Sequence, residues 1–363
     1  MPADLTIENG RIVSISPIQG ECDMDLGTNK VLPGFIDIHC HGAYGFDTNY
    51  AREEGMKKWQ KNITHEGVTS FLATTITDHK EVLLKALKNA DKVMHENNPG
   101  AHILGIHFEG PYLSKKHAGA QPLSCILPPD IEEAKEYMAA CHNNIRIMTY
   151  APEEDKDGSF TRFLRENNIV PSIGHTDATY EDCQKARKNG AMSMTHTFNA
   201  MTPLHHRKPG AVGFALNQSD MYSEIICDTF HVDKEVLKIF FKSKDEDKSL
   251  MITDALYAKG LKPGTVFEFG GQPTVLSESG LAFIQGTNTI AGSTLKMNVG
   301  LRNLIEKAGV PYVQAILSSS QNQADLLGEK ERGRLQEGCY ADITVLDDDY
   351  EVVHTFVDGI LQF

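Results

Sequence analysis

The sequence predicts an α/β protein, a (β/α)8 barrel of the TIM type with a small β-sandwich domain built from both chain termini. Both ends of the 363-residue chain show short strand patterns with hairpin turns. Between them, eight short apolar runs alternate with amphipathic stretches over about 300 residues, and roughly 250 residues is typical of such a barrel. We therefore expect a β-sandwich domain of residues 1–32 plus 332–363 and a barrel domain of residues 33–331.

The two ends of the chain supply the strands of the small domain. At the start, LTIENGRIVSI has an Asn9-Gly10 turn between alternating runs, and the end carries a second turn of this type at Asp358-Gly359. A single hairpin is marginally stable in water. We therefore expect the two ends to pair into one β-domain.

The barrel strands are expected where the apolar runs lie, at 35–41, 67–74, 102–110, 145–152, 169–176, 191–198, 223–230 and 249–256. Amphipathic helices are expected between them, at 51–67, 79–97, 130–143, 159–168, 179–190 and 233–244. An open doubly wound sheet is the rival architecture, but no G-x-G-x-x-G follows the first strand. The Gly- and Pro-rich stretch 259–289 looks like a hairpin insertion after the eighth strand.

Composition narrows the classes of partner. The formal net charge is -14 and no basic block or stripe is present, which argues against nucleic acid and anionic membranes. Seven scattered cysteines without a C-x-x-C pair fit a reducing compartment better than a disulfide framework. The chain shows no signal-peptide pattern and no apolar run near the roughly 20 residues that span a bilayer. We therefore expect a cytoplasmic protein.

Polar residues follow the predicted strands at their carboxyl ends, where the active sites of such barrels form. Singly, a His or Asp at a strand end is more often hydrogen-bonded or solvated than a ligand. Several of them on one rim predict a metal site. The candidates are His39 and His41 (strand one), Glu109 (three), His175 (five), His196 (six), His231 (after seven) and Asp254 (eight).

Imidazoles with a carboxylate suit a divalent transition metal, and no cysteine is needed. Glu109, His175 and His196 can hold one ion with an open position for water. His39 and His41 can supply a second ion, with Glu109 able to bridge. A bound metal lowers the pKa of water towards about 7, and Asp254 can then move the proton. Zinc is the first expectation, and iron or manganese serve the same ligands.

Several motifs resemble a known family. VLPGFIDIHCHG is similar to the first-strand signature of the amidohydrolase superfamily. Together with it, HFEGPYLS, IGHTDATY, THTFNAMTPLHHRKPG, ICDTFHVD and ITDAL resemble the N-acetylglucosamine-6-phosphate deacetylase family along nearly the whole chain. The resemblance implies a hydrolase that converts N-acetyl-D-glucosamine 6-phosphate to D-glucosamine 6-phosphate and acetate, in amino-sugar catabolism.

The same resemblance assigns roles to residues. It implies Glu109, His175 and His196 as the main metal ligands and Asp254 as the catalytic acid/base. Some members lack the two first-strand histidines and hold one ion, so His39 and His41 imply two ions here.

On the substrate side, the resemblance implies that Arg207 reaches the phosphate from the neighbouring subunit of a homodimer. The remaining substrate contacts that it implies are Asn199 and Ala200 for the phosphate, His231 for the sugar, and the backbone at Ile290, Ala291 and Gly292. Without the resemblance, Arg207 is more simply a surface residue beside a turn.

The stretch KKHAGAQP departs from the family pattern. Some members have a histidine there that polarises the acetyl carbonyl, whereas Gln121, with Ala120 beside it, takes that place in this chain and His117 lies further upstream. Gln121 can donate a hydrogen bond but supplies no positive charge, so carbonyl polarisation rests more on the metal.

Two other functions are open. A cyclic amidase or dihydroorotase-like enzyme commonly bridges its metals with a modified lysine after the fourth strand, yet no lysine precedes Lys156 there. A non-catalytic scaffold would usually have lost several ligands, yet all expected positions are filled.

Overall fold

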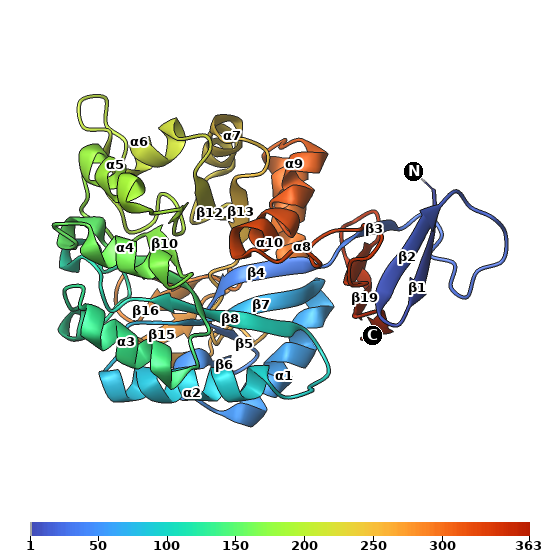
Figure 1. The fold of residues 1–363 in the computed structure, drawn as a ribbon, viewed down its shortest axis with the longest axis horizontal. Coiled ribbons are helices and arrows are strands. Elements are labelled where there is room, and N and C mark those ends of the chain that lie inside the picture. Colours follow the sequence, from blue (N-terminus) through green and yellow to red (C-terminus); the bar gives the residue numbers. More distant parts are fainter. Residues whose placement is uncertain (1) are drawn as a thin grey trace.

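A parallel eight-stranded sheet forms the centre of the computed structural model, which describes residues 2–363 (Figure 1). Neighbouring strands in the sheet follow the order of the chain, and each of the eight predicted runs supplies one strand. The strands are β4 (Phe35–Cys40), β7 (Val68–Thr75), β8 (His102–Glu109), β9 (Ile145–Tyr150), β10 (Val170–Ile173), β11 (Ser193–Met194), β12 (Tyr222–Ile226) and β13 (Ser249–Ile252).

The first and last strands close this sheet into a barrel. The Asp254 amide donates to the His39 carbonyl at 2.9 Å, and the His41 amide donates to the Ala255 carbonyl at 2.8 Å. Cys40 and Ala255 also form a parallel bridge. The predicted (β/α)8 barrel is therefore confirmed, and the open doubly wound sheet is excluded.

Helices surround the barrel (Figure 1). Each of the six predicted helical stretches contains one, and α7, for example, buries Leu237, Phe240 and Phe241 on one face. Local caps fix the boundaries, as at α5, where Thr179 and Asp182 form a capping box. The helices are α1 (Glu53–Ile63), α2 (Lys80–Met94), α3 (Ile131–Ala140), α4 (Ser159–Glu166), α5 (Tyr180–Asn189), α6 (Gly210–Asn217), α7 (Lys234–Ser243), α8 (Met297–Arg302), α9 (Tyr312–Leu317) and α10 (Gln321–Leu327).

Short elements fill several connections of the barrel. A π-helical turn, Asn303–Lys307, continues α8. The 3-10 turns are Thr48–Tyr50, Thr64–Glu66, Lys115–His117, Leu123–Cys125 and Pro152–Glu154, and β5 (Gly42–Ala43) pairs with β6 (Phe46–Asp47).

The two chain ends lie together beside the barrel (Figure 1). β1 (Asp4–Glu8) and β2 (Arg11–Ser16) form a hairpin, and β3 (Lys30–Pro33) pairs with β18 (Ile343–Leu346) in a sheet that continues to β19 (Val352–Val357) and β20 (Ile360–Leu361). The Ile12 amide donates to the Cys339 carbonyl at 3.0 Å and so ties the hairpin to the other end. The domain boundaries at 32/33 and 331/332 stay a prediction.

The insertion after β13 is larger than the predicted hairpin. It forms a four-stranded antiparallel sheet of β14 (Val266–Phe269), β15 (Gln272–Leu276), β16 (Ala282–Ile284) and β17 (Ile290–Gly292). In β14, Phe267 and Phe269 are buried while Val266 and Glu268 are exposed. One face of the sheet therefore packs on the protein, and this face holds the additional strands in place.

Among residues 2–363, no helix has both the length and the apolar character that crossing a bilayer requires.

Candidate metal centre and active site

The predicted metal ligands lie at the carboxyl ends of the barrel strands. Glu109 ends β8, while His175, His196 and Asp254 each follow a strand by two residues. These three residues have φ angles of 45°, 28° and 51°, a left-handed backbone that side-chain-bearing residues rarely adopt. Such strain persists where the surrounding structure enforces it, and it is concentrated at functional sites.

Three side chains form the first group of possible ligands. Glu109 Oε1 lies 3.0 Å from His196 Nε2 and 3.4 Å from His175 Nε2. The two Nε2 atoms are 3.1 Å apart, and His175 Nδ1 donates to the His117 carbonyl at 2.8 Å. Because Nδ1 of His175 carries the proton, its Nε2 presents a lone pair to the group. Two imidazole nitrogens and a carboxylate at this spacing fit a divalent cation.

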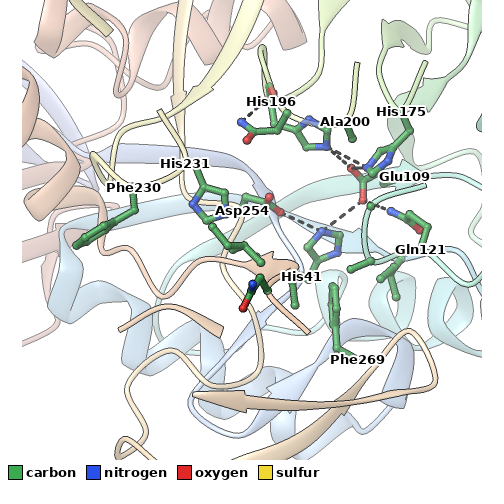
Figure 2. Close-up of a pocket in the computed structure, with 18 residues that line it drawn as sticks. His41, Glu109, Gln121, His175, His196, Ala200, Phe230, His231, Asp254 and Phe269 are labelled. Carbon is green, nitrogen blue, oxygen red and sulfur yellow. Dashed lines mark hydrogen bonds and ion pairs between the residues drawn. The ribbon is translucent and has the colours of Figure 1, made fainter. Parts of the chain in front are cut away.

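The first-strand histidines His39 and His41 form a second group with the same carboxylate. Figure 2 shows His41 on the side of Glu109 opposite to His175 and His196. His39 Nε2 lies 3.5 Å from Glu109 Oε1, and His41 Nε2 lies 3.5 Å from Glu109 Oε2. His39 Nε2 is buried without a hydrogen-bond partner among the described residues. A buried nitrogen of this kind is costly unless a cation uses its lone pair, so this group also fits a metal ion.

The charges of the site favour an ionised Glu109 and a neutral His39, whereas the pKa values of His41 and His196 are raised. Burial lowers the pKa of His39 to about 4, so its ring is neutral at pH 7. Burial opposes ionisation of Glu109, yet the imidazoles that surround it, above all those of His39 and His175, hold the pKa of Glu109 well below its usual range. Burial lowers the pKa of His196, but the hydrogen bond to Glu109 and the charge of that carboxylate outweigh it and raise this pKa to about 9. An ionised Glu109 is therefore available at neutral pH, and a cation that binds must displace the proton of His196.

Asp254 lies beside both groups and faces the cavity. Its Oδ1 is 3.2 Å from His41 Nε2 and 3.5 Å from His39 Nε2. Burial raises the pKa of Asp254, but the hydrogen bond to His41 and the neighbouring imidazoles of His39 and His196 outweigh it and lower the pKa. Asp254 is therefore a carboxylate at neutral pH and can accept a proton.

A cavity of about 300 Å³ opens above these residues (Figure 2). It is lined by eight of the nine predicted substrate residues, namely Ala120, Gln121, Asn199, Ala200, His231, Ile290, Ala291 and Gly292. Arg207 is the exception, because it lies exposed on the loop between β11 and α6. The side chains that line the cavity within residues 2–363 include no lysine or arginine.

Gln121 is already engaged at the ligand Glu109. Its Nε2 donates to Glu109 Oε2 at 2.7 Å, and its Oε1 accepts the Thr77 amide at 2.9 Å. Only the second amide hydrogen is left for the substrate carbonyl predicted as its partner. His117 stays outside the cavity lining, with its ring 3.3 Å from Asp177 Oδ1.

The sequence reasoning missed several residues of the site. Glu224 on β12 is fully buried, and its Oε2 accepts hydrogen bonds from His39 Nδ1 at 2.8 Å and the His196 amide at 3.2 Å. Asp228 holds His231 through a 2.6 Å contact to Nδ1, while Phe230 and Phe269 line the cavity. A glutamate inside the apolar run SEIIC was the available signal for Glu224, whereas Phe230 and Phe269 gave none.

His107 was predicted to be a packed, hydrogen-bonded inner residue, and this is confirmed. Its Nδ1 donates to the Ile38 carbonyl at 3.0 Å, and its Nε2 accepts from Thr149 Oγ1 at 2.8 Å. Both ring nitrogens are therefore used, which leaves none for a metal.

A closed barrel with buried imidazoles and carboxylates at its carboxyl-terminal rim, open to a cavity, defines a metal-dependent hydrolase of the amidohydrolase type. In agreement, the Amidohydrolase family model matches residues 30–361. The N-acetylglucosamine-6-phosphate deacetylase of Bacillus subtilis is 41% identical over 337 residues, which cover 92% of this chain and 84% of the relative. The N-acetylgalactosamine-6-phosphate deacetylase of Escherichia coli O157:H7 is 31% identical over 98% of this chain and 94% of its own length.

Solved structures agree with these relatives. A mutant of the N-acetyl-D-glucosamine-6-phosphate deacetylase from Mycobacterium smegmatis, in complex with N-acetyl-D-glucosamine-6-phosphate, superposes with a TM-score of 0.93 at 30% identity and covers 99% of this chain and 94% of that one. The Thermotoga maritima enzyme gives a TM-score of 0.89 at 33% identity, over 99% of this chain and 94% of that one. The chain belongs to the N-acetylglucosamine-6-phosphate deacetylase family of amidohydrolases.

Proposed function

We propose that this enzyme hydrolyses the acetamide of N-acetyl-D-glucosamine 6-phosphate to D-glucosamine 6-phosphate and acetate, in amino-sugar catabolism. The observation that carries the proposal is the position of Glu109 between two pairs of histidines, with Asp254 beside them at the floor of the cavity. The family and its relatives support the same reaction.

The residues would hold one or two divalent cations, with zinc as the first choice and iron or manganese as alternatives. Glu109, His175 and His196 would bind one ion, and His39 and His41 would bind the second together with Glu109. When bound, such a cation lowers the pKa of water towards about 7 and polarises the amide carbonyl.

Asp254 moves the proton in the proposed reaction. Water attacks the acetyl carbonyl carbon while the Asp254 carboxylate takes one of its protons. Asp254 then returns this proton to the amide nitrogen as the C–N bond breaks, so that the amine and acetate leave. Its lowered pKa keeps it ready to accept the proton at neutral pH.

The phosphate group of the substrate needs a positive partner that the cavity of one chain does not offer within residues 2–363. Asn199 and Ala200 line the cavity, and Arg207 is exposed nearby in the chain. We therefore propose that Arg207 of a second copy in a homodimer binds the phosphate, since an arginine guanidinium can bind two phosphate oxygens at once. His231, held by Asp228, and the backbone at 290–292 would contact the sugar.

The two other functions considered from the sequence receive less support. A dihydroorotase-like enzyme would require a lysine in the site. No lysine is among the cavity-lining residues of the described chain. A non-catalytic scaffold leaves the grouping of five possible ligands centred on Glu109 unexplained, four of which line the cavity.

The test is an acetate-release assay on N-acetylglucosamine 6-phosphate, on its galactosamine epimer and on unphosphorylated N-acetylglucosamine. We expect the glucosamine phosphate to be the best substrate and the unphosphorylated sugar to react poorly. Chelation should abolish acetate release, and adding back zinc, iron or manganese one at a time should restore it and identify the metal. Equal rates with and without the phosphate, or full activity after verified metal removal, would contradict the proposal.

A further inference from the structure

Glu224 is a buried carboxylate that none of the proposed catalytic steps uses. It lies on β12 and is 0% exposed. Its Oε2 accepts from His39 Nδ1 at 2.8 Å and from the His196 amide at 3.2 Å, while its Oε1 has no hydrogen-bond partner in the part of the chain that the structure describes. One carboxylate oxygen thus contacts both groups of possible metal ligands.

The bond to Glu224 decides which nitrogen of His39 carries the proton. The His196 amide already donates to Glu224 Oε2, so this oxygen is an acceptor. His39 Nδ1, which contacts the same oxygen, therefore bears the hydrogen, and Nε2 is left with a lone pair. This Nε2 lies 3.5 Å from Glu109 Oε1 and 3.5 Å from Asp254 Oδ1. Without Glu224, the opposite tautomer would place an N–H towards these two carboxylates, and that hydrogen would occupy the position of a cation.

Among the described residues, the ring nearest to His39 cannot replace this contact. His107 packs against it, with ring centroids 4.4 Å apart, but both nitrogens of His107 are bonded to the Ile38 carbonyl and to Thr149. The other group is supported differently, because His175 Nδ1 donates to the backbone carbonyl of His117. A side-chain substitution can therefore remove the support of His39 while leaving that of His175 intact.

We propose that Glu224 is a positioning residue that fixes the Nδ1–H tautomer of His39 and thereby supports the cation at His39, His41 and Glu109. The cation at Glu109, His175 and His196 depends on it much less, since Glu224 reaches that group only through the His196 backbone. The inference rests on the metal centre of the proposed function. It adds the reason why the two cation sites respond differently to a substitution of Glu224.

The experiment compares Glu224→Gln and Glu224→Leu with the wild-type chain. Metal-free protein is titrated with zinc, and the number and affinity of bound ions are measured by elemental analysis and chelator competition. We expect the wild type to bind two ions and E224L to bind one. E224Q should bind the second ion about 10–100-fold more weakly than the wild type, with its affinity for the first ion within about threefold of wild type.

Glu66→Gln is the matched control. Glu66 is equally buried and bonds Lys259 at 2.9 Å, away from the candidate ligands. The substitution removes a buried charge in the same way, and we expect it to retain both ions. Loss of the second ion in E66Q to the same extent as in E224Q would overturn the proposal, because any weakened core would then have this effect.

Further outcomes also decide the question. A folded E224L variant with two ions of unchanged affinity overturns the proposal, and so does a wild-type chain that binds one ion whatever residue stands at 224. If E224L does not fold, histidine-selective ¹⁵N spectra of metal-free wild type and E224Q report the tautomer of His39, assigned with His39→Asn. An Nε2–H tautomer in the wild type overturns the proposal. If the enzyme releases no acetate but the number of bound ions still depends on Glu224, the result counts against the proposed reaction alone.

Discussion

Glu109 shows at the scale of one residue how the site is balanced. The residue is only 2% exposed, and its two oxygens contact four imidazoles and the Gln121 amide. A buried carboxylate is stable only when such partners offset its desolvation. Substitutions of its neighbours should therefore separate contributions to cation binding from contributions to the chemical step.

Asp254→Asn should retain the cations and lose turnover. Asparagine has nearly the same shape but does not accept a proton from water, so we expect kcat to fall about 10²–10⁴-fold. Metal content by elemental analysis should equal that of the wild type. Turnover within about tenfold of wild type in this variant would mean that another group moves the proton.

Gln121→Leu should weaken cation binding as well as catalysis. The variant removes the 2.7 Å hydrogen bond from Gln121 to Glu109 Oε2, and a hydrogen bond to a charged group contributes about 1.5–3 kcal/mol. Chelator competition should therefore show a cation affinity roughly 10-fold or more below that of the wild type.

The control for this substitution is Gln272→Leu. Gln272 donates to the Ala120 carbonyl, 3.2 Å away in the loop between β8 and α3, and makes no hydrogen bond to a candidate ligand. We expect its cation affinity to be unchanged. If Q121L keeps the wild-type affinity and loses only kcat, Gln121 acts on the substrate carbonyl alone.

How far single residues could be predicted from the sequence depends on where they lie. His39 and Glu109 end apolar runs, and the strand pattern alone places their side chains at the rim. Glu224 lies in the middle of such a run, where pattern reasoning expects only packing, and its partner His39 is 185 residues away. Phe230 and Phe269 reach the cavity through loop and insertion geometry that no local pattern encodes.

At the scale of elements, the insertion β14–β17 is built against the cavity. Phe269 of β14 and all three residues of β17 line it, and the turn after β14 packs on the loop that carries Ala120 and Gln121. The insertion therefore forms part of the wall of the site.

The same element shows the limit of strand prediction. The terminal hairpins were predictable because Asn9-Gly10 and Asp358-Gly359 both adopt positive φ angles, as such two-residue turns require. In the insertion, strands of three to five residues alternate with glycines, and only their packing against the barrel identifies them. A hairpin was predicted where four strands are present.

Gly270→Ala should disturb the site through this packing. A Cβ at Gly270 would lie 2.8 Å from the Ala120 carbonyl, so the loop with Gln121 must shift. We expect kcat/KM to fall about 10-fold, because misplacement by about 1 Å is costly in catalysis. The measurement is steady-state kinetics with a thermal melt for each variant.

Gly271→Ala provides the control within the same turn. Its φ is 72° against 57° for Gly270, so both alanines strain the backbone, but a Cβ at Gly271 meets nothing within 4 Å. G271A should lose about 1 kcal/mol of stability through backbone strain, G270A should lose more because its Cβ also clashes, and only G270A should lose activity. Equal kinetics in both would mean that the insertion does not position the loop.

At the scale of the whole molecule, the cavity that residues 2–363 of one chain form lacks a permanent positive charge to bind the phosphate of the proposed substrate. The net charge is -14 and the cavity lining of the described residues has no lysine or arginine, yet the proposed substrate carries a phosphate. Arg207 is exposed on a loop where Leu204 is 57% exposed, which suits contact with a second copy. The barrel was predictable from its strand pattern, but the sequence alone shows neither this exposure nor the missing charge.

Mixing two inactive variants tests whether Arg207 acts across a dimer interface. In a heterodimer of Arg207→Ala and Asp254→Asn chains, the site with Asp254 intact receives Arg207 from the other chain, and the second site lacks both. Random exchange makes half of the dimers mixed, so about a quarter of the wild-type activity should return when the two variants are co-expressed or refolded together. Each variant alone, at the same total concentration, is the control. If Arg207 instead serves its own chain, no site in the mixture is complete, and activity will stay at the level of the two separate variants.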